Sequence, residues 1–412
     1  MFDYDVVIIG AGPAGAVSAA KLNSDGFSVL IIEKMNFPRF VIGESLLPIC
    51  MEYLEDTDLL QTIKNQNFQT KTGACFFNNG EICEFDFSYK FTDGWDYTYQ
   101  VKRSDFDYAL IEEVQRKGVE VSFNSSVIDV SCSKKKQTIS YVNCNNKQID
   151  VSCKFIIDAS GYGRVLPRLF NLEKPVKSEK RGAIFSHISD YNKSKKDSNN
   201  IFIHAFNNNS AWVWSIPFSD NSASVGIVSN TDYIEKCAEN NGELFKELIK
   251  SSPMLKERFI DSKFLFKEKT IYNYAASSSK LYGEGFVLCG NATEFLDPVF
   301  SSGVALAMAS GHLAAKLIKK ELNMGNVNWE IEYSEKMNAG INVFRSYVNA
   351  WYSGDLQKIF FSKEIKEEYK KQICSVLAGY VWDETNPFVK KHKKIIQTLS
   401  NVIEINERSI NI

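Results

Sequence analysis

Length, composition and charge set the first limits on this chain. It has 412 residues, 44% of them hydrophobic and 24% charged, with a formal net charge of −2, so we expect more than one lobe and no electrostatic basis for binding nucleic acid. Nine cysteines without CxxC pairs or zinc-like spacing to the four histidines indicate reduced thiols and no metal site. The N-terminus does not resemble a signal peptide and no run of about 18 apolar residues occurs, which predicts a cytoplasmic protein without membrane insertion.

The N-terminal residues predict a β-turn-α-β unit. Residues 5–9 form a β-branched run typical of a buried strand, a glycine-rich turn follows at 10–15, a helical pattern continues to about residue 25, and residues 28–32 predict a second strand. Further strands are expected at 119–123, in several segments to about 157, at 155–161, across 180–230 and at 285–292. Further helices are expected at 103–117, at 231–260, from about Ser302 onward and over most of 328–412.

This order of elements predicts an α/β fold with three regions. The first is a discontinuous Rossmann-like nucleotide-binding domain of residues 1–170 plus 270–325. The second is an inserted mixed β-sheet domain on the substrate side, formed by residues 60–100 and 175–270. The third is a helical C-terminal tail over residues 326–412.

The glycine-rich turn GAGPAG predicts a dinucleotide site. Gly10, Gly12 and Gly15 match GxGxxG, with Ala14 beside the last glycine, and the turn follows a strand and opens a helix. Glycines let the backbone approach a pyrophosphate, and the helix N-terminus offers unpaired N–H groups to its charge. Glu33, at the end of the second strand, is expected to accept hydrogen bonds from a ribose hydroxyl.

Two further stretches call for an explanation. In AWVWSIPF, Trp212 and Trp214 are two residues apart on one strand, so they share a face and form either sheet core or a wall between two compartments. In FQTKTGACFF, Lys71 lies among apolar and small residues. A lone lysine is usually a surface cation, but these flanks predict burial, and a buried lysine has a lowered pKa and can take part in chemistry.

Three segments resemble the flavoprotein monooxygenase superfamily that is built like p-hydroxybenzoate hydroxylase. They are Arg103 at the head of the helix RSDFDYALIEEV, DASGYGR at 158–164 and FVLCGNATEFLDP at 286–298. The resemblance implies that the Rossmann-like domain binds FAD, and the contacts that it implies are Arg103, Asp158, Gly161, Gly290 and Asn291.

The segment at 286–298 departs from the superfamily at one position. Asn291 stands where the superfamily usually has an aspartate that bonds the ribityl chain, and the carbonyl of Asn291 can accept the same bond. Only one complete GxGxxG is present, so NAD(P)H is not expected to have a domain of its own. Reduced flavin is then expected to come from elsewhere.

The chain is also similar to the flavin-dependent halogenases, whose WxWxIP fingerprint is complete as Trp212, Trp214, Ile216 and Pro217. The segment around Lys71 resembles the active-site lysine region of that family. The resemblance implies that the tryptophans lie between the flavin and the substrate chamber. Bulky rings there would keep an organic substrate away from the reactive flavin and disfavour direct hydroxylation.

Two more segments agree with this family. FPRFVIGESLLP at 37–48, which contains Arg39, looks like the strap that runs over the flavin, so Arg39 is a candidate FAD contact. FLDPVFSSGVALA at 295–307 looks like the segment near the isoalloxazine. Family resemblance and the helix N-terminus together assign Ser302 and Gly303 to chloride or bromide. An ordinary N-cap serine is the alternative at this turn.

Phe300 narrows the substrate class. Tryptophan-halogenating members of the family have a glutamate at this position, so free tryptophan is not the expected substrate. The pattern is closer to the branch that acts on phenols and pyrroles, often attached to a carrier protein, and the C-terminal segments 349–361 and 375–389 look like that branch. Three aromatic residues of the C-terminal helices are expected either to stack on a substrate ring or to fill the helical core: Tyr347, Trp351 and Tyr352.

The resemblance implies a mechanism with named partners. A separate flavin reductase supplies reduced FAD, which reacts with O2 and oxidises chloride to hypochlorous acid. The acid passes the tryptophans and reaches Lys71, which acts as ammonium or as chloramine in electrophilic substitution of an electron-rich ring. His187 and His204 are expected to be structural. The alternatives are an FAD-dependent aromatic hydroxylase, a flavin-dependent isoprenoid reductase, and a non-enzymatic flavin-binding or carrier-docking module.

Overall fold

A parallel sheet forms the centre of the N-terminal part of the molecule. The computed structural model describes residues 2–176, 179–193, 199–207, 209–363 and 365–410. The first sheet runs in the order β18–β19–β10–β1–β2–β7, and β1 pairs in parallel with both β2 and β10. Its strands are β18 (Tyr282–Gly283), β19 (Phe286–Leu288), β10 (Gln148–Asp158), β1 (Tyr4–Ile9), β2 (Val29–Ile32) and β7 (Glu120–Ser122). The predicted β-turn-α-β unit is confirmed, with α1 (Pro13–Ser24) as its helix.

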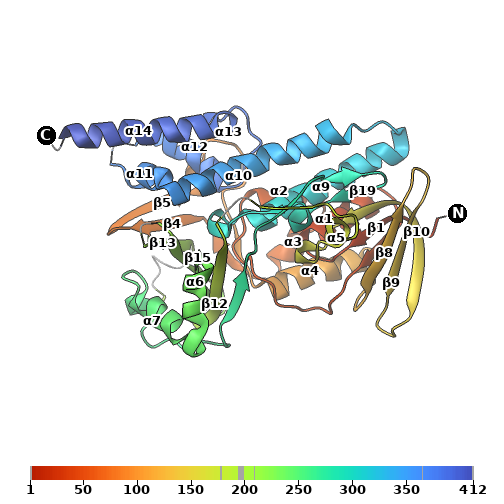
Figure 1. Cartoon of the computed structure of the whole chain (residues 1–412), viewed down its shortest axis with the longest axis horizontal. Helices are drawn as coiled ribbons and strands as arrows, with labels where there is room; N and C mark the ends of the chain where they lie inside the picture. The colour runs from red at the N-terminus through yellow and green to blue at the C-terminus, as the bar shows by residue number, and fades with distance from the viewer. Residues whose placement is uncertain (1, 177–178, 194–198, 208, 364, 411–412) are drawn as a thin grey trace.

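Helices cover one side of the first sheet. Helix α1 packs against α9 (Ser302–Met324) and α4 (Arg103–Arg116) (Figure 1). A Cβ at Gly311 would lie 2.4 Å from the backbone oxygen of Ala14, so a glycine on α9 permits this close approach to α1. Beyond β10, the strands β9 (Gln137–Val142) and β8 (Ser126–Cys132) extend the sheet in antiparallel pairing.

A second sheet joins segments that lie far apart in the sequence. Its order is β16–β12–β15–β14–β13–β4–β5, and β13 pairs in parallel with β4. The strands are β16 (Lys269–Tyr272), β12 (Arg181–Ser189), β15 (Ser222–Asn230), β14 (Ala211–Pro217), β13 (Ile201–Phe206), β4 (Gly73–Asn78) and β5 (Glu81–Asp86). One face packs with α6 (Thr231–Ala238), α7 (Glu243–Ser251) and α8 (Lys256–Phe259) in a separate apolar cluster. The other face, which carries Trp212 and Trp214, belongs to the main core.

The C-terminal part is helical, as predicted. Figure 1 shows its helices along one side of the molecule, with α10 reaching from above the first sheet towards the second. They are η6 (Glu330–Glu335), α10 (Lys336–Ser353), α11 (Asp355–Phe361), α12 (Glu367–Leu377), α13 (Pro387–Lys390) and α14 (His392–Ile410). Tyr347 and Trp351 are fully buried, and their rings contact Phe300 at centroid distances of 6.0 and 5.9 Å. These two side chains therefore fill the helical core.

Short elements complete the fold. The two-stranded ribbon of β3 (Gln69–Lys71) and β6 (Thr98–Gln100) lies outside both large sheets. The remaining elements are α2 (Ile49–Asp56), α3 (Leu60–Lys64), α5 (Val165–Leu169) and a small sheet of β11 (Glu173–Lys174), β17 (Ala276–Ser278) and β20 (Glu294–Phe295). Within the described ranges, no helix combines the length and apolar character needed to cross a membrane. The predicted α/β fold with several sheets and a helical C-terminal region is confirmed, and the domain boundaries stay predictions.

Candidate functional site

A cavity of about 770 Å³ opens where the carboxyl ends of β1, β2 and β10 meet the inner face of the second sheet. Ligands of open α/β sheets bind at this edge. Thirteen of the predicted site residues line the cavity: Gly10, Gly12, Ala14, Glu33, Arg39, Arg103, Gly161, Trp212, Trp214, Ile216, Gly290, Asn291 and Gly303. Five predicted residues are not part of this lining in the described structure: Gly15, Lys71, Asp158, Pro217 and Ser302.

The glycine turn brings bare backbone to the cavity. Gly10 has φ +100°, and a Cβ there would lie 2.5 Å from the backbone oxygen of Ala159. A Cβ at Gly15 would lie 2.0 Å from the oxygen of Gly10. Gly12 is different, because the nearest atom to its Cβ position is a side-chain nitrogen of Arg39, 3.6 Å away. Open space beside Gly12 at the N-terminus of α1 is what a pyrophosphate requires.

Glu33 holds the glycine turn and faces the cavity at the same time. Its Oε2 accepts a hydrogen bond from the backbone N–H of Ala11 at 2.8 Å, and its Oε1 accepts one from the N–H of Met35 at 2.8 Å. The side chain is buried but belongs to the cavity lining. A carboxylate fixed in this way is suited to receive ribose hydroxyl groups.

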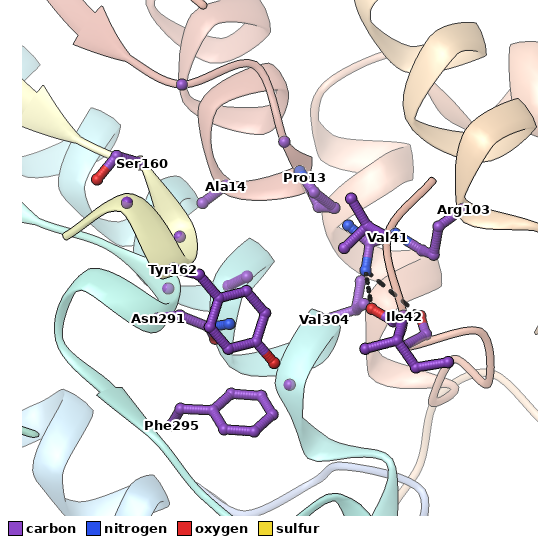
Figure 2. Close-up of a pocket in the computed structure, with 18 of the residues that line it drawn as sticks. Pro13, Ala14, Val41, Ile42, Arg103, Ser160, Tyr162, Asn291, Phe295 and Val304 are labelled. Carbon is purple, nitrogen blue, oxygen red and sulfur yellow. Dashed lines mark hydrogen bonds between the residues drawn. The ribbon is translucent and has the colours of Figure 1, made fainter. Parts of the chain in front are cut away.

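Two cationic side chains on the opposite wall share one buried carboxylate. Arg103 donates through Nε and Nη2 to Asp107 at 2.8 and 2.9 Å, and Arg39 donates through Nη1 to Asp107 at 3.1 Å. The Nη1 of Arg103 also donates to the backbone oxygens of Ile42 and Gly43, as Figure 2 shows. Asp107 was missed in the sequence, although its i,i+4 spacing from Arg103 on one helix was a usable signal. The arginines thus anchor the segment 37–48 beside the cavity.

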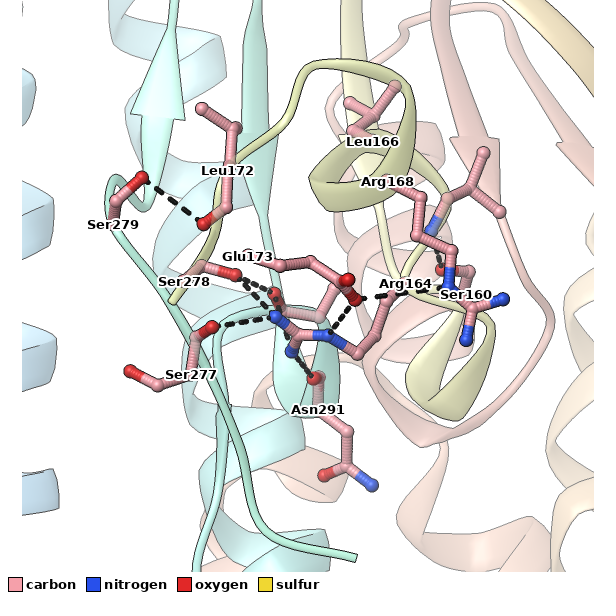
Figure 3. A network of polar contacts seen from close by, with 12 residues as sticks. Ser160, Arg164, Leu166, Arg168, Leu172, Glu173, Ser277, Ser278, Ser279 and Asn291 are labelled. Carbon is pink, nitrogen blue, oxygen red and sulfur yellow. Dashed lines mark hydrogen bonds and ion pairs between the residues drawn. The ribbon is translucent and has the colours of Figure 1, made fainter. Parts of the chain in front are cut away.

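The predicted segments 158–164 and 286–298 are attached to each other through Arg164 (Figure 3). This arginine has a left-handed backbone with φ 44°, and its guanidinium donates to the backbone oxygens of Asn291 at 2.8 Å and Ser277 at 2.9 Å. Asp158 is fully buried and accepts from the backbone N–H groups of Ser160 and Leu166, while burial raises the pKa of its carboxyl. Asn291 remains in the cavity lining beside these loops.

The two tryptophans of β14 form a tethered wall of the cavity. Their ring centroids are 5.7 Å apart with an interplanar angle of 47°, which confirms that they share a face. The Nε1 of Trp214 donates to Ser224 Oγ at 3.1 Å. The Nε1 of Trp212 donates to the hydroxyl of Tyr352 on α10 at 2.9 Å. Both indoles are therefore fixed at their polar edges.

A buried aspartate continues the Trp212 contact. The hydroxyls of Tyr352 and Tyr274 both donate to Asp297 Oδ2, at 2.9 and 2.8 Å. The Arg181 guanidinium lies 3.5 Å from the centroid of the Tyr352 ring. Burial raises the pKa of the Asp297 carboxyl, and the hydrogen bonds from the two tyrosines oppose that shift. Tyr352 thus links the tryptophan wall to the turn that precedes α9. The sequence pattern around Tyr352 did not indicate this role.

Lys71 is fully buried directly behind the cavity wall. Its Nζ donates to Ser45 Oγ at 2.9 Å and to the backbone oxygen of Leu46 at 2.8 Å, and it lies 5.5 Å from the centroid of the Phe87 ring. Loss of water on burial lowers the pKa of Lys71 to about 7. Ser45 itself lines the cavity. Lys71 is therefore one side chain away from the space that the glycine turn and the tryptophans enclose.

The turn before α9 has no side-chain cap. Ser301 is the N-cap residue with φ 57°, and it makes no capping hydrogen bond to the helix. Ser301 and Gly303 line the cavity, and Ser302 is buried. The first N–H groups of this long helix thus lie at the cavity without a capping side chain, an arrangement that favours an anion. The ordinary N-cap alternative does not describe this turn.

Glu44 was also missed as a cavity residue. It lines the cavity while buried, and its Oε1 lies 2.7 Å from His187 Nε2. His187 belongs to β12 and packs among Phe40, Phe218 and Phe266. The sequence shows only that Glu44 lies within GESLL. Its partner His187 is 143 residues away, so no local pattern indicated this contact.

Several known proteins are similar to this chain over most of its length. The family described as "FAD binding domain" matches residues 3–336. A 1H-pyrrole-2-carbonyl-[peptidyl-carrier protein] chlorinase of Pseudomonas fluorescens is 27% identical over 92% of this chain and 90% of its own length. The corresponding brominase of Pseudoalteromonas luteoviolacea is 29% identical over 92% and 93%. A flavin-dependent halogenase of Armillaria mellea is 31% identical over 79% of this chain and 69% of its own length.

Solved structures share the fold of this chain. A flavoprotein/dehydrogenase of Cytophaga hutchinsonii superposes with a TM-score of 0.95 at 46% identity, covering 98% of this chain and 99% of that one. A triple mutant of the flavin-dependent brominase Bmp2 superposes with a TM-score of 0.82 at 27% identity, covering 98% and 100%. The FAD-binding domain extends over most of the chain, and the chain belongs to the flavin-dependent halogenases, FAD-dependent oxidoreductases that halogenate aromatic compounds.

Proposed function

We propose that this protein halogenates an electron-rich ring, a pyrrole or a phenol, that is attached to a peptidyl-carrier protein. Two similar enzymes are named for action on 1H-pyrrole-2-carbonyl groups bound to a carrier. Phe300, in place of the glutamate expected in tryptophan-halogenating members, supports a substrate other than free tryptophan. The observation that carries the proposal is Lys71, a buried amine with a pKa of about 7 that is bonded to a residue of the cavity wall.

The residues of the cavity fit FAD. The open backbone at Gly12 receives the pyrophosphate, Glu33 receives the ribose, and Arg39 and Arg103 line the wall that the segment 37–48 covers. When bound, reduced FAD from a separate flavin reductase supplies the oxygen activation that turns a halide into a halogenating oxidant. The uncapped turn at Ser302 and Gly303 holds chloride or bromide.

The chain's own side chains then direct that oxidant. Trp212 and Trp214 occupy the wall with their indoles tethered, so a ring-sized substrate is excluded from the cavity. Lys71 binds the oxidant through an N–H that is not donated to Ser45 or Leu46, and it delivers the halogen to the ring. The hypohalous oxidant gives its halogen to the ring and releases hydroxide, which takes up the proton lost by the ring and forms water.

A substrate comparison tests this proposal. The holoenzyme is supplied with a flavin reductase, NADH, O2 and bromide, and it receives pyrrole-2-carbonyl carrier protein, free pyrrole-2-carboxylate or a simple phenol. We expect a bromine isotope doublet on the carrier-bound pyrrole, formed about tenfold or more faster than on either free compound. Equal rates on free and carrier-bound substrates would contradict the carrier-bound assignment.

A further inference from the structure

The ribbon of β3 and β6 places two polar residues on the same face as Lys71. Lys71 pairs directly with Thr98 in the antiparallel register, and Gln100 follows two residues later. Directly opposed residues of an antiparallel pair share a face, as do residues i and i+2 of one strand. Tyr99 between them turns the other way, and its ring packs against Phe68. Gln100 also forms a β-bridge with Ser45, and the hydroxyl of Ser45 accepts a hydrogen bond from Lys71.

Thr98 and Gln100 are fully buried, yet their polar atoms have no partner. In the described part of the chain, Thr98 Oγ1 and both Gln100 side-chain atoms, Nε2 and Oε1, make no hydrogen bond. Buried polar groups of folded proteins are nearly always bonded, and leaving one unmade is costly. Three such atoms lie on the face of the ribbon that carries the buried lysine, so a polar ligand admitted to this face would supply the hydrogen bonds that they lack.

Gln137 shows what a structural glutamine looks like in the same molecule. It is also buried, but its Oε1 accepts from the backbone N–H of Ser133, and its Nε2 donates to the backbone oxygen of Ser133. Its amide is satisfied within the protein. The amide of Gln100, in contrast, leaves both its donor and its acceptor without a hydrogen bond on the Lys71 face of the ribbon.

We infer that Gln100, assisted by Thr98, recognises a substrate that presents an N–H donor and a carbonyl acceptor side by side, as a pyrrole-2-carbonyl group does. The inference rests on the proposed function and names the ring chemistry that the site selects. A primary amide offers a donor and an acceptor on one edge, so it can pair with both groups at once. A phenol presents one hydroxyl and satisfies only one of the two.

Such pairing also orients the ring. The bonds from Gln100 fix the edge that carries the ring nitrogen and its carbonyl, so the carbons away from that edge are left to meet Lys71 on the same face of the ribbon. The same contact discriminates between substrates, because a ring without the N–H would leave the amide oxygen of Gln100 buried and unpaired.

Binding of two probes to the FAD-loaded protein tests this inference. Calorimetry compares the pantetheine amide of pyrrole-2-carboxylic acid with its N-methyl analogue, in wild type, Gln100→Leu and the matched control Gln137→Leu. We expect wild type to bind the N–H probe about tenfold or more tightly than the N-methyl probe, and this ratio of dissociation constants is the preference. In Gln100→Leu the preference falls to about one and the melting temperature is unchanged or higher. Gln137→Leu lowers the melting temperature and keeps the preference.

Two results would overturn the inference. One is a preference that survives in Gln100→Leu, or that wild type lacks. The other is a loss of melting temperature in Gln100→Leu as large as that in Gln137→Leu, which would identify a structural amide. Probe binding is measured separately from catalysis. If halogenated product forms but Gln100→Leu keeps the probe preference, only the role of Gln100 is rejected. If the probe preference is as expected but no halogenated product forms, the proposed function is rejected.

Discussion

The Lys71 ammonium lies in a buried environment that disfavours its charge. Its pKa falls to about 7 because burial removes water from the ammonium, and the nearby Cys50 thiol opposes that shift only if ionised. Burial raises the pKa of Cys50 to about 12, so the thiol is neutral at pH 7. The amine and ammonium forms of Lys71 are then both populated near neutral pH, and either one is available for chemistry.

Replacement of Lys71 by methionine should stabilise the protein while abolishing halogenation. The unfolded lysine has a pKa near 10.5 and the folded one a pKa of about 7, so the penalty for burying the charge is complete below pH 7 and disappears as the pH rises to 10.5. We expect Lys71→Met to raise the free energy of unfolding at pH 6 by roughly 2–4 kcal/mol, after subtraction of two lost hydrogen bonds.

Urea unfolding at pH 6 and pH 9.5 measures this effect. The advantage of Lys71→Met over wild type should shrink at the higher pH, because the wild-type lysine is then neutral in the folded state and partly neutral in the unfolded one. A constant difference between the two pH values, or a less stable variant at pH 6, would show that the lysine is not desolvated as described. Lys174→Met, at an exposed position, serves as the control and should change little.

At the scale of elements, neighbouring strands and a distant helix hold the tryptophan wall in place. Trp214 pairs with Gly226 on β15, and a Cβ at Gly226 would lie 2.2 Å from the indole ring. Trp212 depends on Tyr352 of α10, which in turn donates to Asp297. Glycine at position 226 therefore leaves the room that the Trp214 indole occupies, and the hydrogen bonds through Tyr352 to Asp297 fix the Trp212 indole.

Gly226→Ala should displace the Trp214 ring. The added methyl group overlaps the indole, and such overpacking costs about 1–3 kcal/mol of stability. We expect changed tryptophan fluorescence, a lower melting temperature and less halogenated product per NADH consumed, because the wall no longer confines the oxidant. Ser224→Ala is the comparison, since it removes only the hydrogen bond from Trp214 Nε1. An unchanged product yield in Gly226→Ala would mean that Trp214 does not confine the oxidant.

Local patterns predicted elements better than they predicted contacts. The strand at 5–9, the helix from Ser302 and the shared face of Trp212 and Trp214 follow from the spacing of neighbouring residues, so the sequence was sufficient to predict them. The contact of Trp212 with Tyr352 spans 140 residues, and that of Lys71 with Ser45 depends on how a ribbon meets a distant segment. Partners of this kind are set by tertiary packing, which no local pattern encodes.

At the scale of the whole molecule, two sheets and one helix share a single cavity. The first sheet contributes its strand ends and the glycine turn, and the second contributes the tryptophan face. Helix α10 reaches from one sheet towards the other (Figure 1). Its Tyr352 hydroxyl accepts a hydrogen bond from Trp212 in the wall. The C-terminal helices therefore take part in the site as well as in the core.

The most direct test of halogenation at Lys71 is the mass of the product that wild type and Lys71→Ala form from pyrrole-2-carbonyl carrier protein. Each enzyme receives FAD, a flavin reductase, NADH and O2, with and without bromide. We predict a bromine isotope doublet that requires bromide and disappears in Lys71→Ala, while NADH consumption continues. A gain of one oxygen that is indifferent to bromide and survives in Lys71→Ala would contradict this account and identify an aromatic hydroxylase.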